Sequence, residues 1–199
     1  MFFGIQIIIF IFEKKYMNDS YIYKKNKISY YKMTIKFEKE TEGVLLVCSK
    51  KGLKNYFLDK EFEYNFPEGI LPLINSGVVV ALTTESSEEV KGELIDIGMN
   101  DYKGYKLAGE QNLHIEEDDE LYILSHSEFT QICSSNKGDI DTFKFWNEKI
   151  VIKDFRQGWA IIFTHYKMRK NSMYLKTIIQ LVYTKNKFPY EEITSIPTV

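Results

Sequence analysis

The sequence concentrates carboxylates in two short segments, 85–89 and 116–120. Their acidic residues are Glu85, Glu88, Glu89, Glu116, Glu117, Asp118, Asp119 and Glu120. Residues 85–128 together carry 13 acidic and 3 basic side chains, so a strongly negative block lies within a chain whose total charge is only −2. Adjacent like charges repel one another, and binding of a cationic partner would relieve that repulsion. The negative field would also steer such a partner toward the acidic surface. The two segments predict a surface that binds a basic partner, although loops that only keep a β protein soluble have a similar composition.

Residues that could hold a metal or act in catalysis are few and poorly spaced. The three histidines, His114, His126 and His165, form no H-x-H or H-E-x-x-H pattern, and the two cysteines form no C-x-x-C. The acidic run at 116–120 lacks the spaced acids and central glycine of a calcium-binding EF-hand. Residues 125–128, Ser-His-Ser-Glu, contain the residue types of a hydrolase triad, but neighbours on a strand point to opposite faces. We therefore expect a non-enzymatic protein with no metal and no cofactor.

Aromatic residues make up 15% of the chain and offer a second kind of binding surface. Trp146 and Trp159 are candidate anchors for a partner, because tryptophan is enriched in interface hot spots. The alternative is that they are core residues, which is the commoner role of tryptophan. An alternative to protein binding is a small-molecule or carbohydrate-binding β-domain that uses Tyr102, Tyr105 and Trp159. The C-terminal part is basic and contains tyrosines, as single-strand nucleic-acid binders do. Since those tyrosines alternate as core residues should, we expect no nucleic-acid binding.

The elements that must position these residues are mostly strands, because apolar residues recur with period two from Met33 onward. Candidate strands are 34–39, 43–49, 77–84, 90–97, 102–107, 112–116, 120–125, 150–153, 159–166 and 174–184. The turn at 40–43 predicts an opening hairpin, and the acidic run predicts another between 112–116 and 120–125. The apolar run at 77–84 is typical of a strand buried on both faces. Helical spacing is limited to the regions of Leu53–Phe57, Phe129–Cys133 and, more weakly, Phe143 with Trp146. The pattern predicts a mainly β fold, an antiparallel β-sandwich or open barrel with one or two short helices.

The first 32 residues differ from the rest of the chain. Residues 1–12, MFFGIQIIIFIF, would cover about half of a bilayer core, which needs about 20 apolar residues. They also lack the basic start and small-residue cleavage site of a secretory signal. Translation could start at Met1, Met17 or Met33. We expect 1–32 to be a disordered extension or a mis-assigned start, with membrane association only if residues 2–12 act as a surface anchor, and 33–199 to form a single β-rich domain.

Two cysteines, Cys48 and Cys133, lie in patterns typical of a strand and a short helix. Free, buried thiols are the expected state, which is typical of a cytoplasmic protein. Together these observations predict a cytoplasmic, non-enzymatic binding protein whose acidic loops contact a basic protein. An inhibitor or immunity-type protein that covers the cationic active site of a nuclease would fit this charge pattern.

Overall fold

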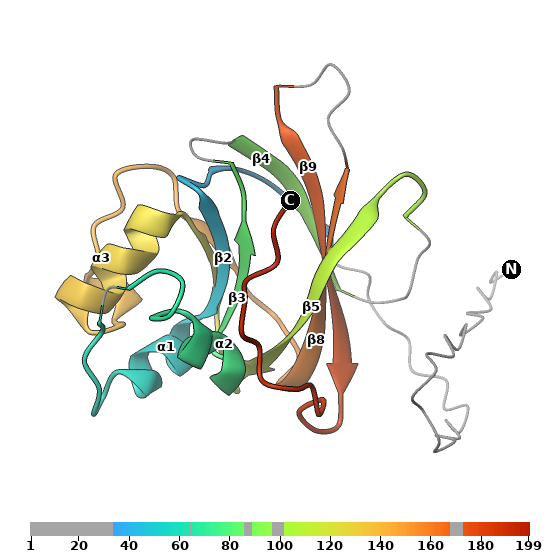
Figure 1. Ribbon diagram of the computed structural model, residues 1–199. Coiled ribbons are helices and arrows are strands. Elements are labelled where there is room, and N and C mark those ends of the chain that lie inside the picture. Colours follow the sequence, from blue (N-terminus) through green and yellow to red (C-terminus); the bar gives the residue numbers. More distant parts are fainter. Residues whose placement is uncertain (1–33, 64, 86–88, 97–101, 168–172) are drawn as a thin grey trace, which may run out of the picture.

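The computed structural model describes residues 34–63, 65–85, 89–96, 102–167 and 173–199 (Figure 1). The expectations for residues 1–32, and for Glu88 of the first acidic segment, lie outside the described residues. In the described part of the chain, two β-sheets pack face to face and short helices cover the outer face of the second sheet. The expected mainly β, sandwich-like fold is therefore confirmed.

The first sheet has five strands in the order β1-β4-β9-β8-β5. These are β1 (Thr34–Glu40), β4 (Glu89–Asp96), β9 (Leu175–Thr184), β8 (Gly158–Lys167) and β5 (Lys106–Ile115). All neighbours are antiparallel except β4 and β9, which run parallel. The parallel β4–β9 pair is the one departure of this sheet from the expected antiparallel pairing. A parallel pair needs a long crossover, and here the crossover contains every element between β4 and β9.

The second sheet has four antiparallel strands in the order β3-β2-β6-β7. They are β3 (Val79–Thr83), β2 (Val44–Ser49), β6 (Leu121–Leu124) and β7 (Ile150–Ile152). The helices that accompany it are α1 (Lys50–Tyr56), α2 (Leu71–Ser76), α3 (His126–Asn136) and the single 3₁₀ turn η1 (Ile140–Thr142). Helices α1 and α3 lie where helical spacing predicts them, whereas the short α2 was not expected. None of the helices in the described ranges is both long and apolar enough to cross a membrane.

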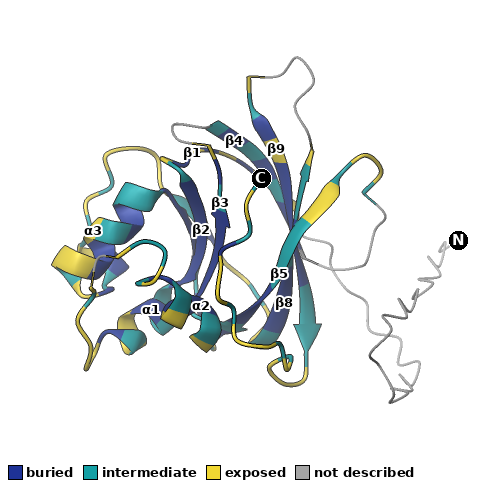
Figure 2. Cartoon of the chain, viewed as in Figure 1, coloured by how far each residue is buried: buried dark blue, intermediate teal, exposed yellow. Residues whose placement is uncertain are grey.

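Two hydrophobic cores share the second sheet. Leu45 and Val47 of β2 face the first sheet, whereas Val44, Leu46 and Cys48 face the helices. Strand β3 alternates in the same way, so it is buried on both faces as the apolar run at 77–84 predicts (Figure 2). A sheet that lies between two other layers must be apolar on both faces. Its strands therefore contain continuous runs of apolar residues instead of alternating apolar and polar residues.

Both predicted hairpins are wrong. Strand β1 pairs with β4, and β2 pairs with β3 and β6, so the turn after β1 carries the chain from one sheet to the other. Likewise β5 pairs with β8 in the first sheet, while β6 belongs to the second. The acidic segment 116–120 is therefore an inter-sheet connection. A turn signal specifies that the chain reverses, but it does not specify which strand supplies the hydrogen bonds.

Candidate functional site

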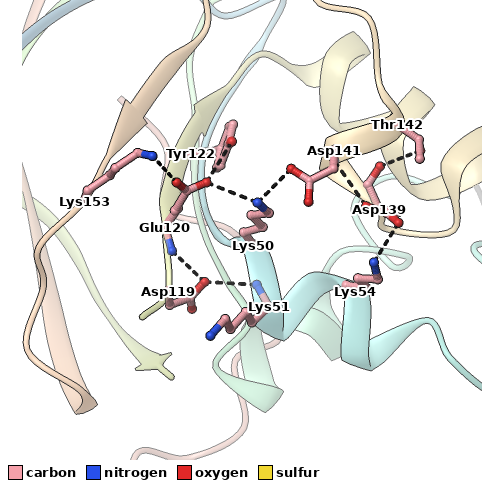
Figure 3. A network of polar contacts seen from close by, with 10 residues as sticks. All are labelled: Lys50, Lys51, Lys54, Asp119, Glu120, Tyr122, Asp139, Asp141, Thr142 and Lys153. Carbon is pink, nitrogen blue, oxygen red and sulfur yellow. Dashed lines mark hydrogen bonds and ion pairs between the residues drawn. The ribbon is translucent and has the colours of Figure 1, made fainter. Parts of the chain in front are cut away.

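The centre of the acidic run is built into the fold through Asp119, whose side chain is only 5% exposed. Its carboxylate accepts hydrogen bonds from Lys51 N at 3.0 Å and from Glu120 N at 2.8 Å (Figure 3). It also accepts a hydrogen bond from Ser49 Oγ at 2.5 Å. Ser49 is the N-cap of α1, and its oxygen in turn accepts from Gly52 N at 2.9 Å. Asp119 thus ties the inter-sheet connection to the first turn of α1, and in this arrangement its carboxylate is not available to a partner.

The negative charge of Glu120 is balanced by lysines of the same chain. Its carboxylate lies 2.5 Å from Lys153 Nζ and 3.2 Å from Lys50 Nζ, and it accepts a hydrogen bond from the Tyr122 hydroxyl at 3.2 Å (Figure 3). The hydrogen bond from Lys153, together with the Lys50 ammonium, outweighs partial burial and lowers the pKa of Glu120 from its ordinary 4.5 to about 2. Lys50 also pairs with Asp141 at 2.7 Å. The network connects α1, β6, η1 and the end of β7.

This network gives a pH-dependent prediction. Because the folded pKa of Glu120 is depressed, its contribution to stability is complete above pH 4.5 and is lost as the pH falls toward about 2. After a discount for solvent screening, Glu120→Gln should lower the free energy of unfolding by about 1–2 kcal/mol at neutral pH. The difference from wild type should fall to about half or less by about pH 3. Urea unfolding at a series of pH values measures it; a constant difference between neutral pH and about pH 3 would contradict the assignment.

The rest of the acidic run is partly engaged. Glu116 accepts a hydrogen bond from Asn55 Nδ2 at 2.9 Å, and Lys51 Nζ donates to the backbone oxygen of Glu117 at 2.5 Å. The side chains of Glu117 and Asp118 are exposed. Partner binding by this segment therefore stays a prediction, and it concerns chiefly these two carboxylates.

A more concentrated acidic surface lies around a cavity of about 160 Å³ at the other end of β6. We call it the acidic cleft. Its carboxylates are those of Glu38, Glu40, Glu42, Glu128 and Glu148. The single ammonium group among its lining residues is that of Lys39, and the indole of Trp146 completes the wall. Trp146 is 51% exposed and packs edge-on against Phe143, with ring centroids 5.4 Å apart. Of the two predicted aromatic anchors, it is the one with a largely accessible ring.

The floor of the acidic cleft is a buried ion pair. Lys39 Nζ lies 2.5 Å from Glu128 Oε2, and the two side chains are 7% and 1% exposed. Glu128 is also the third residue of α3, where it accepts a hydrogen bond from Ser125 N at 2.9 Å and completes a capping box. Its other oxygen, Oε1, is buried and has no hydrogen-bond partner in the described part of the protein. The floor therefore retains an unused acceptor.

On the rim of the acidic cleft, hydrogen bonds hold the Glu42 carboxylate in place. Glu42 accepts hydrogen bonds from Ser125 Oγ at 2.9 Å and from both N and Oγ of Ser127, the former at 3.0 Å. Burial alone would raise the pKa of Glu42, but these hydrogen bonds more than offset it and hold the pKa below its ordinary value. Glu38 pairs with Lys91 at 2.9 Å.

The first predicted acidic segment adjoins this cleft. Thr84 N donates to Gly43 O at 2.9 Å, which places the exposed Glu85 beside the β1–β2 turn. The β1–β4 register sets Glu89 opposite Glu40. Glu85 and Glu89 therefore extend the acidic surface that begins at the cleft, whereas segment 116–120 lies at the opposite end of the second sheet.

The three aromatic residues of the predicted carbohydrate site do not come together. Tyr102 and Tyr105 are neighbours, with ring centroids 6.4 Å apart, and Tyr102 packs on His165 at 5.1 Å. The β5–β8 register places Trp159 opposite His114 and places His165 opposite Leu107. Since Trp159 and His165 are six residues apart on one strand, about 20 Å separates them. Trp159 instead lines a cavity of about 240 Å³ with His114 and Glu116.

The described residues contain no group of three or more side chains that could hold a metal ion. Cys48 and Cys133 are free and buried, as the sequence predicts, and burial raises the pKa of both thiols. Buried, protonated thiols are poor nucleophiles and poor metal ligands. The two cysteines therefore act as small apolar side chains of the core beneath the helices.

Comparison with known proteins leaves the function open. No family model matches the sequence, and no curated protein matches it. A solved structure described as crocagin biosynthetic gene J is similar to 76% of this chain and to 98% of its own, with a TM-score of 0.46 and 8% identity. A similarity at this level assigns neither activity nor ligand to the chain.

Proposed function

We propose that the protein is a non-enzymatic binding protein that engages a basic protein partner through the acidic cleft. The observation that carries the proposal is the juxtaposition of five carboxylates with the half-exposed indole of Trp146 around one cavity. A lysine or arginine side chain entering the cleft would meet carboxylates on the rim and an aromatic face beside them. Charge complementarity speeds association, and a cation over an indole adds attraction when water is excluded.

An inhibitor or immunity-type protein, which covers the cationic surface of an enzyme, is the form of this function that the charge pattern favours. Two features support it. The hydrogen bonds from Ser125 and Ser127 hold Glu42 in place before any partner arrives, and preorganised charges lose less entropy on binding. The free thiols of Cys48 and Cys133 fit a reducing compartment such as the cytoplasm.

A single-tryptophan variant tests the cleft directly, because the chain has only two tryptophans. In the full chain carrying Trp159→Phe, Trp146 is the sole indole reporter. We expect a hexa-arginine peptide to change its fluorescence saturably, and we expect the affinity to fall when salt rises from about 50 mM to about 300 mM. A hexaglutamate peptide is the negative control. No saturable change with hexa-arginine would contradict the proposal.

Two matched double variants locate the contact. Glu40→Gln with Glu148→Gln removes two exposed rim charges, and Glu117→Gln with Asp118→Asn removes two exposed charges from the acidic run. The first pair should weaken hexa-arginine binding by about tenfold, since each lost charge pair costs up to about 1 kcal/mol. The second pair should weaken it by less than about threefold, because its charges lie at the other end of the second sheet, where salt screens their effect on the cleft. Equal losses of affinity would show that only the total charge matters. A larger loss of affinity in the second pair would show that the peptide binds at the acidic run instead of the cleft.

A further inference from the structure

The cavity beside Trp159 has a chemistry different from that of the acidic cleft. It has a volume of about 240 Å³ and brings together residues from α1, the end of α2, β5, the β5–β6 connection and β8. The side chains that matter here are Asn55, Tyr56, Ser76, His114, Glu116 and Trp159. Sites for drug-sized ligands occupy about 300–1,000 Å³, so this cavity suits a smaller molecule. We call it the tryptophan pocket.

The aromatic wall of the pocket is held rigidly. The Trp159 and His114 rings pack with centroids 4.7 Å apart, on adjacent strands in register. Gly77 ends α2 with φ +77°, and a β-carbon added there would lie 2.5 Å from Cζ3 of Trp159. His114 N donates to Gly77 O at 2.8 Å. A glycine is therefore required both for the backbone turn and for the close approach of the indole.

The rest of the lining is mostly polar and includes one acidic residue, Glu116. Asn55 Nδ2 donates to Glu116 Oε1 at 2.9 Å, which orients the Glu116 carboxylate, and Ser76 and Tyr56 add hydroxyl groups. A carboxylate accepts hydrogen bonds from ligand hydroxyls, and an amide side chain both donates and accepts. The carboxylate disfavours an anionic ligand. The combination fits a neutral ring that presents C–H groups to the indole and hydroxyl groups to the polar side chains.

We propose that the tryptophan pocket binds a single sugar ring, such as a neutral hexose or N-acetylhexosamine. The proposal is independent of the acidic cleft, with which the pocket shares no lining residue. It also gives Glu116 a role that the acidic run alone does not suggest, since Glu116 is among the residues that line the pocket while Glu117 and Asp118 are not.

The test uses the full chain carrying Trp146→Phe, in which Trp159 is the sole indole reporter. Glucose, galactose, mannose and N-acetylglucosamine are titrated separately, and saturation-transfer NMR on the same samples detects binding without relying on the indole. We expect at least one of the four sugars to change the fluorescence saturably and to receive saturation transfer. Absence of both signals for all four sugars would overturn the proposal.

A matched pair of variants in the Trp146→Phe background assigns any binding to this pocket. Glu116→Gln removes the carboxylate that faces the pocket and should weaken sugar binding by about tenfold. Glu117→Gln makes the same charge change at the exposed neighbour and should leave the affinity within about twofold. Equal affinities in the two variants would overturn the assignment. Hexa-arginine binding is measured with Trp146 in a different variant. A negative result in one experiment therefore does not affect the interpretation of the other.

Discussion

Replacement of Lys39 by methionine is expected to lower the free energy of unfolding by about 3–5 kcal/mol. Methionine retains most of the apolar stem but removes the ammonium group that lies 2.5 Å from Glu128 Oε2. Glu128 is 1% exposed, so its charge would be left buried without a counter-charge, and its second oxygen already lacks a hydrogen-bond partner among the described residues. Breaking one side of a buried pair costs much more than the pair itself contributes.

Two comparisons make the Lys39 result specific. Lys36→Met, at an exposed position of the same strand, should change stability by less than about 0.5 kcal/mol. The double variant Lys39→Met with Glu128→Met should recover part of the loss, because it removes the stranded charge, although it also removes the capping box of α3. Urea unfolding measures all three. A loss below about 1 kcal/mol in Lys39→Met would mean that the Glu128 charge is solvated in some other way.

Asp119→Ala is expected to lower the free energy of unfolding by about 3 kcal/mol, because it leaves one buried hydroxyl and two half-buried N–H groups without their acceptor. The Ser49 hydroxyl and the backbone N–H groups of Lys51 and Glu120 lose their shared acceptor. The first turn of α1 and the inter-sheet connection should both loosen.

The control for Asp119 lies next to it. Asp118 is exposed and has φ +53°, a conformation that asparagine tolerates, so Asp118→Asn should cost less than about 0.5 kcal/mol. Thermal or urea unfolding of the two variants measures the contrast. Equal stabilities would show that Asp119 is not the structural acceptor described above.

The role of Asp119 changes how partner binding must be tested. Reversing the whole of Glu116, Glu117, Asp118 and Asp119 to lysine would lower stability and change surface charge together. A loss of binding in such a variant would therefore not identify a contact. Variants that leave Asp119 and Glu120 intact separate the two effects.

The strands were predictable because their apolar residues recur with the period of an extended chain. Strand β9 places Leu175, Ile179 and Leu181 on the face that enters the core between the sheets, and β3 shows the continuous apolar run of a strand between two layers. Pairing was not predictable from local signals. The turn after β1 and the acidic run both have hairpin composition, yet each connects two sheets, because the choice of partner depends on which apolar faces must meet in the core.

The acidic cleft was harder to predict than the acidic run, because its residues come from three distant segments. Glu42, Glu128 and Glu148 meet only after the β1–β2 turn packs on the start of α3. Two local signals were nevertheless present. Glu38, Glu40 and Glu42 recur at every second position, and Ser125-x-x-Glu128 is a capping-box pattern at a helix start.

Affinity capture from the source lysate tests whether the acidic cleft binds a basic protein, with the full wild-type chain and the Glu40→Gln/Glu148→Gln variant as parallel baits. Captures at about 50 mM and about 300 mM salt separate electrostatic from other contacts. We predict that a basic protein is captured by the wild type at low salt, is lost at high salt, and is strongly depleted with the variant at either salt. Capture of the same protein in equal amounts by both baits, or recovery of no basic protein by the folded wild type at either salt, would rule out binding of a basic protein through the acidic cleft.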